Sequence, residues 1–240
     1  MRQLYADILK AKSENKKLLA ILLDPDKIDW ENVCELVIEI YNSPATHVFV
    51  GGSLVLTNRI DELILAIKQE CNLPIILFPG NPSQISGKAD GILFLSLLSG
   101  RNPDFLIGHQ VQAAPILKRS ALEIIPTGYI LIESGATTAV QMVSKTTPLS
   151  REIPEIAVDT AIAGEMLGNK LIYLEAGSGA KLPVPLDTIR QVADNLSIPL
   201  IVGGGIRSEE EIQNAYKAGA DLVVIGTAFE NDIHFFNKLQ

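Results

Sequence analysis

Short apolar runs alternate with amphipathic segments of helical length along the whole chain. The apolar runs predict eight strands, at 18–24, 47–51, 74–78, 91–95, 128–133, 170–175, 199–204 and 221–226. Helical patterns lie between several of them, at 30–41, 58–70 and 208–219. This alternation predicts an α/β protein with the (β/α)8 TIM-barrel fold, as a single domain over residues 1–240. A doubly wound parallel sheet is the alternative.

One connection departs from this pattern. The segment 79–90, "PGNPSQISGKAD", is all that separates the third and fourth predicted strands. Its two prolines and two glycines disfavour a regular helix. We therefore expect the third helix to be missing or replaced by a loop, which leaves an opening in the outer helical ring.

Composition narrows the class of protein. A hydrophobic content of 47% is typical of strands buried on both faces, and no run is long enough to span a membrane. The net charge of −8 argues against a nucleic-acid partner. Cys34 and Cys71 have no disulfide or metal spacing, and the N-terminus resembles no signal peptide. These features favour a cytoplasmic location.

Glycines end the last two predicted strands. Gly203 and Gly204 end the seventh strand and Gly205 follows it, while Gly226 ends the eighth and Thr227 follows it. In TIM barrels the loops at these two places commonly bind phosphate, through glycine N–H groups and a helix N-terminus. The pattern predicts a phosphorylated ligand without specifying a reaction. The alternative is that the glycines only permit tight turns.

The sixth strand carries a carboxylate into a glycine-rich turn, "YLEAGSGA" at 173–180. Glu175 precedes Gly177 and Gly179, which extend the expected phosphate cradle. A carboxylate there can accept a proton from a hydroxyl of the same ligand. Tyr173 points to the same side of the strand and could orient that ligand. The alternatives are that Glu175 caps a helix or pairs with Lys181, and that Tyr173 only packs.

The first two strands end in candidate ligands for a cation. Asp24 ends the first strand in "LLDPDK", and Ser53 follows the second in "VGGS". Carboxylate and hydroxyl oxygens suit Mg²⁺, which takes its other ligands from water and substrate phosphates. The alternative is that Asp24 and Asp26 are only turn and N-cap residues. The three histidines lack zinc spacing.

The apolar stretch 91–100 lies beside the expected opening in the helical ring. Its side chains exceed what a short strand needs for burial, and they could line a groove for a long hydrocarbon or simply pack in the core. The residues concerned are Phe94, Leu95, Leu97 and Leu98.

Taken together, these motifs resemble geranylgeranylglyceryl phosphate synthases. The matching blocks are "LLDPDK", "VGGS", "SLLSGRNPDFLIGHQVQAAP", "YLEAGSGA", "VGGGIRS" and "IGTAFE", in this order along nearly the whole chain. Enzymes of that family join sn-glycerol 1-phosphate to a prenyl diphosphate, which forms the ether bond of archaeal-type lipids.

The resemblance implies a role for each block. Asp24 and Ser53 would bind Mg²⁺, and Glu175 would be the catalytic base, assisted by Tyr173. Glycerol phosphate would lie against Tyr173, Leu174, Glu175, Ala176, Gly177, Ser178, Gly179, Gly204, Gly205, Gly226 and Thr227. It also implies a homo-oligomer, with a hexamer as the first expectation and a dimer as the second. Phe105, Leu106 and Ile107 would supply a contact face. Transient membrane contact is expected for product release.

Two departures separate the chain from the related heptaprenylglyceryl phosphate synthases. Leu22 stands where those enzymes carry a lysine, and they lack the "AGSGA" run after the strand-six glutamate. Both favour the geranylgeranyl branch, although neither fixes the prenyl length. A phosphosugar isomerase or aldolase, and a non-catalytic phospholigand-binding barrel, are the rival functions for such a scaffold. An aldolase would need a Schiff-base lysine, which no predicted strand interior supplies.

Overall fold

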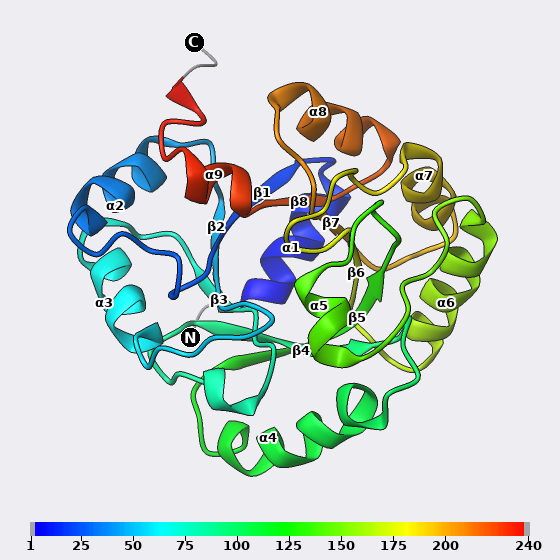
Figure 1. Ribbon diagram of the computed structural model, residues 1–240, viewed down its shortest axis with the longest axis horizontal. Coiled ribbons are helices and arrows are strands. Elements are labelled where there is room, and N and C mark those ends of the chain that lie inside the picture. The colour runs from blue at the N-terminus through cyan, green and yellow to red at the C-terminus, as the bar shows by residue number, and fades with distance from the viewer. Residues whose placement is uncertain (1–2, 238–240) are drawn as a thin grey trace.

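The computed structural model describes residues 3–237, and its centre is a closed barrel of parallel strands that follow one another in chain order (Figure 1). The strands are β1 (Leu18–Leu23), β2 (His47–Val50), β3 (Ile75–Leu77), β4 (Gly91–Leu97), β5 (Glu123–Leu131), β6 (Leu171–Glu175), β7 (Leu200–Gly203) and β8 (Leu222–Ile225). β1 pairs with both β2 and β8, which closes the ring. The predicted TIM barrel is confirmed, and the doubly wound alternative is excluded.

Helices surround the barrel as the amphipathic segments predicted. They are α1 (Leu4–Ser13), α2 (Val33–Asn42), α3 (Ile60–Glu70), α4 (His109–Leu117), α5 (Ala139–Ser144), α6 (Pro154–Met166), α7 (Leu186–Asp194), α8 (Glu209–Ala218) and α9 (Thr227–Asn231). The ends of α8 follow its sequence signals. The Ser208 hydroxyl accepts the N–H of Glu211 at 3.2 Å, and Gly219 ends the helix in the left-handed conformation.

The connection from β3 to β4 lacks a regular helix, as expected. Within the described residues it contains only the 3₁₀ turn η1 (Pro82–Gln84). On the other side of β4, the chain passes through a π turn, η2 (Asp104–Gly108), directly into α4. The outer ring is therefore thin beside β3, and the space between η1 and α4 is open to ligands.

The fifth strand begins earlier than the sequence pattern predicted. It spans Glu123–Leu131 instead of 128–133, even though Pro126 lies inside it. Proline lacks an N–H for the ladder, but the Pro126 carbonyl still accepts the N–H of Lys170 at 2.8 Å. β4 and β5 consequently pair over seven residue pairs, from Gly91 with Glu123 to Leu97 with Tyr129.

Helix α1 covers the N-terminal end of the barrel, and Figure 1 shows it crossing the centre of the ring. Leu4 and Ile8 are buried and pack into the cluster of inward-facing side chains. The Glu123 carboxylate accepts the N–H groups of Leu4 at 2.6 Å and Tyr5 at 3.0 Å, which anchors the helix to β5. Because this end is covered, ligands must approach from the C-terminal ends of the strands. None of the described helices is long and apolar enough to span a membrane.

Candidate active site

Two connected cavities open at the C-terminal end of the barrel. The first, here called the mouth pocket, lies over the strand ends and is lined by residues that include Asp24, Ser53, Tyr173, Glu175, Gly177, Gly204, Arg207, Gly226 and Glu230. The second, here called the groove, runs outward between η1 and α4 and is lined mainly by apolar side chains. The two share a junction formed by Gly52, Ser53, Phe78, Tyr129 and Val140.

Glu175 is buried at the end of β6 and faces the mouth pocket. Burial raises the pKa of its carboxyl to about 7, although the nearby Tyr173 hydroxyl and the Gly177 N–H both favour the charged form. Its Oε1 atom accepts the Gly177 N–H at 2.7 Å. Lys181 is exposed, and no ion pair among the described residues joins it to Glu175. The carboxylate therefore faces the pocket and is held by the backbone, and the interpretation as a partner of Lys181 is wrong.

Glycines of β7 allow that strand to approach the carboxylate. The strand register places Gly203 beside Glu175. A Cβ on Gly203 would lie 2.5 Å from the Tyr173 hydroxyl and 3.0 Å from Glu175 Oε2. A Cβ on Gly204, where φ is +80°, would collide with Glu175 Oε1. The glycine run after β7 therefore does more than permit a tight turn, and Gly203, which sequence reasoning did not assign, belongs to the site.

The predicted cradle residues are brought together at the mouth pocket. Its lining includes Gly177, Ser178, Gly179, Gly204, Gly205, Gly226 and Thr227. Two other candidates, one in β6 and one directly after it, point elsewhere. The side chains of Leu174 and Ala176 alternate away from the barrel interior and pack in the outer core, so only their backbone lies near the site. Arg207, which sequence reasoning missed, lines the pocket and donates to the Ala180 carbonyl at 2.6 Å.

Asp24 lies at the other side of the mouth pocket within a charged network. Its Oδ2 atom is 3.6 Å from Lys27 Nζ, and its backbone N–H donates to Glu230 Oε1 at 2.9 Å. Glu230 Oε2 accepts from Lys27 Nζ at 3.1 Å. Burial raises the pKa of Asp24. Lys27 and Glu230 are additions to the predicted site, and no local sequence signal could join them because they are 203 residues apart.

Asp26 has the structural role that the alternative interpretation proposed. Its carboxylate accepts the N–H groups of Leu56 at 2.7 Å and Thr57 at 3.0 Å, which fixes the loop after β2. The same interpretation does not fit Asp24, whose side chain lines the mouth pocket.

Asp24 and Ser53 offer two oxygen ligands. This number suits Mg²⁺ better than a metal ion whose ligands all come from protein side chains. No group of three or more His, Cys, Asp or Glu side chains in residues 3–237 could hold a metal ion. Asp24 and Ser53 supply one carboxylate and one hydroxyl to the same pocket. Such a sparse oxygen set suits Mg²⁺, which keeps waters and binds substrate phosphates.

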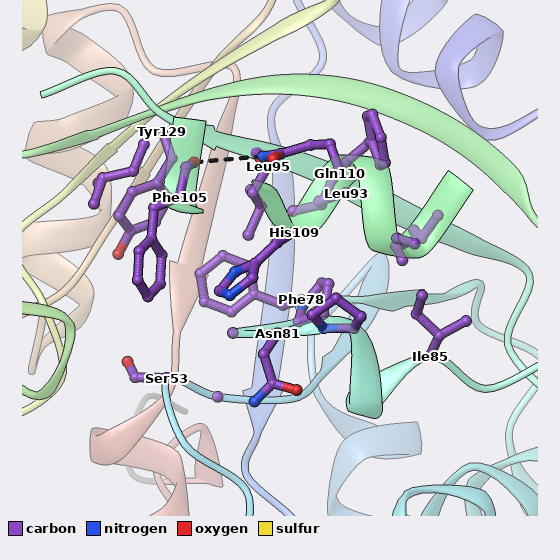
Figure 2. A pocket seen from close by; sticks show the side chains of 18 of the residues that line it. Ser53, Phe78, Asn81, Ile85, Leu93, Leu95, Phe105, His109, Gln110 and Tyr129 are labelled. Carbon is purple, nitrogen blue, oxygen red and sulfur yellow. Dashed lines mark hydrogen bonds between the residues drawn. The ribbon is translucent and has the colours of Figure 1, made fainter. Parts of the chain in front are cut away.

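The groove receives most of the apolar side chains that were expected there. Phe94, Leu95 and Leu97 line it, together with Phe105 from η2. In Figure 2, Ser53 and Asn81 lie along one side, and Leu93, Leu95 and Gln110 lie along the other. Two expectations need correction. Leu98 packs against Gly128 and Gly164, outside the barrel. Phe105 faces the groove and lies edge-on to the His109 ring, with 4.7 Å between the ring centroids. It therefore does not belong to an outer contact face.

Three aromatic rings cluster where the groove meets the mouth pocket. Phe78 lies 6.0 Å from Tyr129 and 5.4 Å from Tyr173 between ring centroids, and the two tyrosine rings are 5.4 Å apart. Both tyrosine hydroxyls are buried without a well-aligned hydrogen-bond partner. Sequence reasoning missed Tyr129. The alternation that placed Tyr173 inward would have found it as well, because β5 and β6 pair Tyr129 with Tyr173.

A model of the PcrB family matches residues 9–239. The chain belongs to this family. A relative from Flavobacterium johnsoniae, named geranylgeranylglyceryl phosphate synthase, is 65% identical over 235 residues, which are 98% of this chain and 97% of the relative. A relative of the same name from Korarchaeum cryptofilum is 45% identical over 221 residues, 92% of this chain and 91% of the relative. These names confirm the resemblance of the sequence motifs.

A solved structure gives the same result in three dimensions. The (S)-3-O-geranylgeranylglyceryl phosphate synthase of Thermoplasma acidophilum, in complex with sn-glycerol-1-phosphate, matches with a TM-score of 0.92 and 36% sequence identity. The match covers 100% of this chain and 96% of that one.

Proposed function

We propose that this PcrB-family protein is a magnesium-dependent prenyltransferase. It joins geranylgeranyl diphosphate to the hydroxyl of sn-glycerol 1-phosphate and releases an ether-linked geranylgeranylglyceryl phosphate. One observation carries the proposal: the buried Glu175 faces a glycine-lined pocket that continues into an apolar groove. A phosphate cradle, a base and a hydrocarbon site are the parts this reaction requires. The names and the bound glycerol phosphate of the relatives support it.

The glycerol phosphate half of the reaction belongs to β6, β7 and β8. The loops at Gly204–Gly205 and Gly226–Thr227 present backbone N–H groups to the phosphate. This places the attacking hydroxyl near Glu175, whose pKa of about 7 suits a base that accepts a proton at neutral pH. Tyr173 lies beside the carboxylate and fixes the orientation of the hydroxyl.

The prenyl diphosphate half belongs to the groove and the junction. The hydrocarbon lies along the groove, and the diphosphate lies toward Asp24 and Ser53, which would hold Mg²⁺. When bound, that ion neutralises the diphosphate charge and assists its departure as a Lewis acid. The rings of Phe78 and Tyr129 face the junction, where positive charge develops on the allylic carbon, and aromatic faces stabilise cations.

The site also argues against a non-catalytic barrel. A buried carboxyl with a raised pKa destabilises the folded protein, and a protein that only binds phosphate gains nothing from it. The same chemistry with a longer prenyl diphosphate, as in heptaprenylglyceryl phosphate synthases, remains the alternative. The purified protein is incubated with Mg²⁺, labelled glycerol 1-phosphate and prenyl diphosphates of 15, 20, 25 and 35 carbons. Fastest transfer with 20 carbons supports the proposal, and transfer with none contradicts it.

The cytoplasmic location and the assembly are part of the same proposal. We expect a hexamer, with a dimer second. Ile107 and Val111 support an interface, because both are exposed and lie four residues apart. Light scattering that reports a monomer at micromolar concentration would exclude both assemblies. Leu54 and Leu56 are exposed near the mouth pocket and favour transient contact with a lipid surface during product release.

A further inference from the structure

The short turn between β3 and β4 carries one buried amide side chain. Gln84 ends η1 and is only 2% exposed. Its Oε1 atom accepts the N–H groups of Gly52 at 3.3 Å and Gly80 at 3.2 Å. Its Nε2 atom donates to the Gly52 carbonyl at 2.9 Å. All three bonds therefore go to the backbone of the loops that follow β2 and β3.

These two loops form one wall of the junction. Gly52 and Ser53 line both cavities, while Gly80 and Asn81 line the groove. The backbones of the two loops are in direct contact, with no side chain between them. A Cβ on Gly80 would collide with the carbonyl oxygens of Gly52 and Ser53, and a Cβ on Gly51 would collide with that of Phe78. A small displacement of either loop would thus change the width of the junction.

The side-chain amide of Gln84 supplies hydrogen bonds beyond the point where the backbone hydrogen bonds between β2 and β3 end. The last backbone bond between the two segments runs from the Phe78 N–H to the Val50 carbonyl at 2.9 Å. Among the described residues, no backbone–backbone hydrogen bond joins 51–54 to 79–82. Gln84 supplies both a donor and acceptors there, which is what a further strand pair would have supplied.

We propose that Gln84 is a positioning residue for prenyl transfer. It holds Gly52–Ser53 against Gly80–Asn81 and so fixes the width of the junction. The prenyl diphosphate lies across this junction, between the groove and the mouth pocket. The same contact sets the distance between the loop and Asp24, because a Cβ on Gly52 would lie 3.0 Å from Asp24 Oδ2. This inference rests on the proposed function. Gln84 itself does not line either cavity, so it acts through the loops.

The test compares Gln84→Met with a control in the same segment. Methionine fills a similar volume and removes all three hydrogen bonds. Ser86→Ala is the control, since Ser86 is also buried but donates to Asp61, away from both cavities. We expect Gln84→Met to lower kcat/KM for the prenyl diphosphate at least tenfold, because small misplacements near reacting atoms cost about 10²-fold in rate. The KM for glycerol 1-phosphate stays within twofold, and Ser86→Ala leaves both substrates unaffected.

Amide hydrogen exchange gives a readout that does not require turnover. In Gln84→Met the peptides that contain Gly52–Ser53 and Gly80–Asn81 exchange faster, while those around Glu175 do not change. A folded Gln84→Met protein with wild-type kinetics, or with equal increases in the KM values of both substrates, overturns the proposal. If Gln84→Met does not fold, Gln84→Glu is judged by the same kinetics, since it keeps the acceptors and loses the donor. A wild-type protein that transfers no prenyl group refutes the proposed function instead, and the exchange result then stands alone.

Discussion

The Oε1 atom of Glu175 accepts the Gly177 N–H at 2.7 Å, which ties the carboxylate to the first glycine of the proposed phosphate cradle. The other oxygen, Oε2, lies on the side of Gly203 and the Tyr173 hydroxyl. One oxygen of the carboxylate is thereby fixed by the backbone, and the other faces the position where a ligand hydroxyl is expected.

Glu175→Gln should abolish most of the activity and leave the fold intact. Glutamine keeps the shape but cannot accept a proton, and a positioned general base contributes about 10²–10⁴-fold to a rate. We expect kcat to fall by that range, with smaller changes in the two KM values, in steady-state assays checked by circular dichroism. Glu133→Gln is the control, because Glu133 follows β5 and is exposed. Near-normal turnover of a folded Glu175→Gln protein would contradict the role of base.

The rate should depend on pH through Glu175. Since the pKa of this carboxyl is about 7, kcat/KM for glycerol 1-phosphate rises as pH increases through 7 and then levels off. The residual activity of Glu175→Gln lacks that rise. Assays between pH 5.5 and 9 separate the two, and an identical rise in the variant would assign it to another group.

The same carboxyl makes stability depend on pH. The unfolded chain releases this proton near 4.5 and the folded chain near 7. Between these values the unfolded state binds fewer protons, so the free energy of unfolding falls as pH rises, and above 7 the loss is complete. Between pH 4 and pH 8 the wild type should lose about 3 kcal/mol of unfolding free energy through this carboxyl, at 1.36 kcal/mol per unit of pKa shift, and Glu175→Gln should not. The variant's stability relative to wild type should therefore be about 3 kcal/mol higher at pH 8 than at pH 4. Urea unfolding at the two pH values measures this difference.

Gly204→Ala and Gly168→Ala separate backbone strain from crowding of the base. Both glycines have a left-handed backbone, with φ of +80° and +92°, so alanine costs roughly 1–2 kcal/mol at either position. Gly168 lines neither cavity and a Cβ there meets nothing within 4 Å, whereas at Gly204 it collides with Glu175 Oε1. We expect similar strain but an additional loss of stability and activity only for Gly204→Ala. Equal kinetics of the two variants would remove Gly204 from the site.

Asp24→Ala should abolish magnesium-dependent turnover and spare glycerol phosphate binding. The reason is spatial, because Asp24 directly follows β1, on the side of the mouth pocket proposed for the diphosphate. Calorimetry measures the affinity for glycerol 1-phosphate, and a turnover assay over a range of Mg²⁺ concentrations measures the metal dependence. Lost glycerol phosphate affinity together with intact prenyl transfer would place Asp24 in the wrong half of the site.

Contact with a lipid surface should depend on the loop after β2. Replacing both Leu54 and Leu56 with serine should weaken co-sedimentation with neutral phosphatidylcholine vesicles and slow product release. The control replaces Met166 and Leu167, which are 82% and 78% exposed at the C-terminal end of α6. Equal effects of the two double variants would point to general hydrophobicity instead of a specific contact.

The barrel could be predicted because its strands are buried on both faces and therefore read as uninterrupted apolar runs. The start of β5 could not, since Pro126 and Gly128 interrupt such a run although the ladder tolerates both. For the site, glycines and a carboxylate at strand ends were sufficient signals to place Glu175 and the predicted cradle glycines at one pocket, while their roles stay predictions.

Other parts of the site leave no local pattern. Gln84 acts through side-chain bonds to backbone in two other loops, and Glu230 meets Lys27 only because β8 closes on β1. Such residues are found by three-dimensional proximity and not by spacing. The wrong assignments have a simpler cause. Leu98 and Phe105 were assigned from their hydrophobicity. Hydrophobicity does not reveal whether a side chain faces the groove or packs elsewhere.

Helix α1 gives the catalytic chamber a sealed floor. Leu4 and Ile8 are each 1% exposed and pack against inward-facing apolar side chains of the strands. Because this end of the barrel is closed, the mouth pocket that Glu175 faces is the route to solvent for a proton that the proposed base accepts. Diphosphate and lipid depart through the same opening, so recharging the base for the next turnover is linked to emptying the chamber.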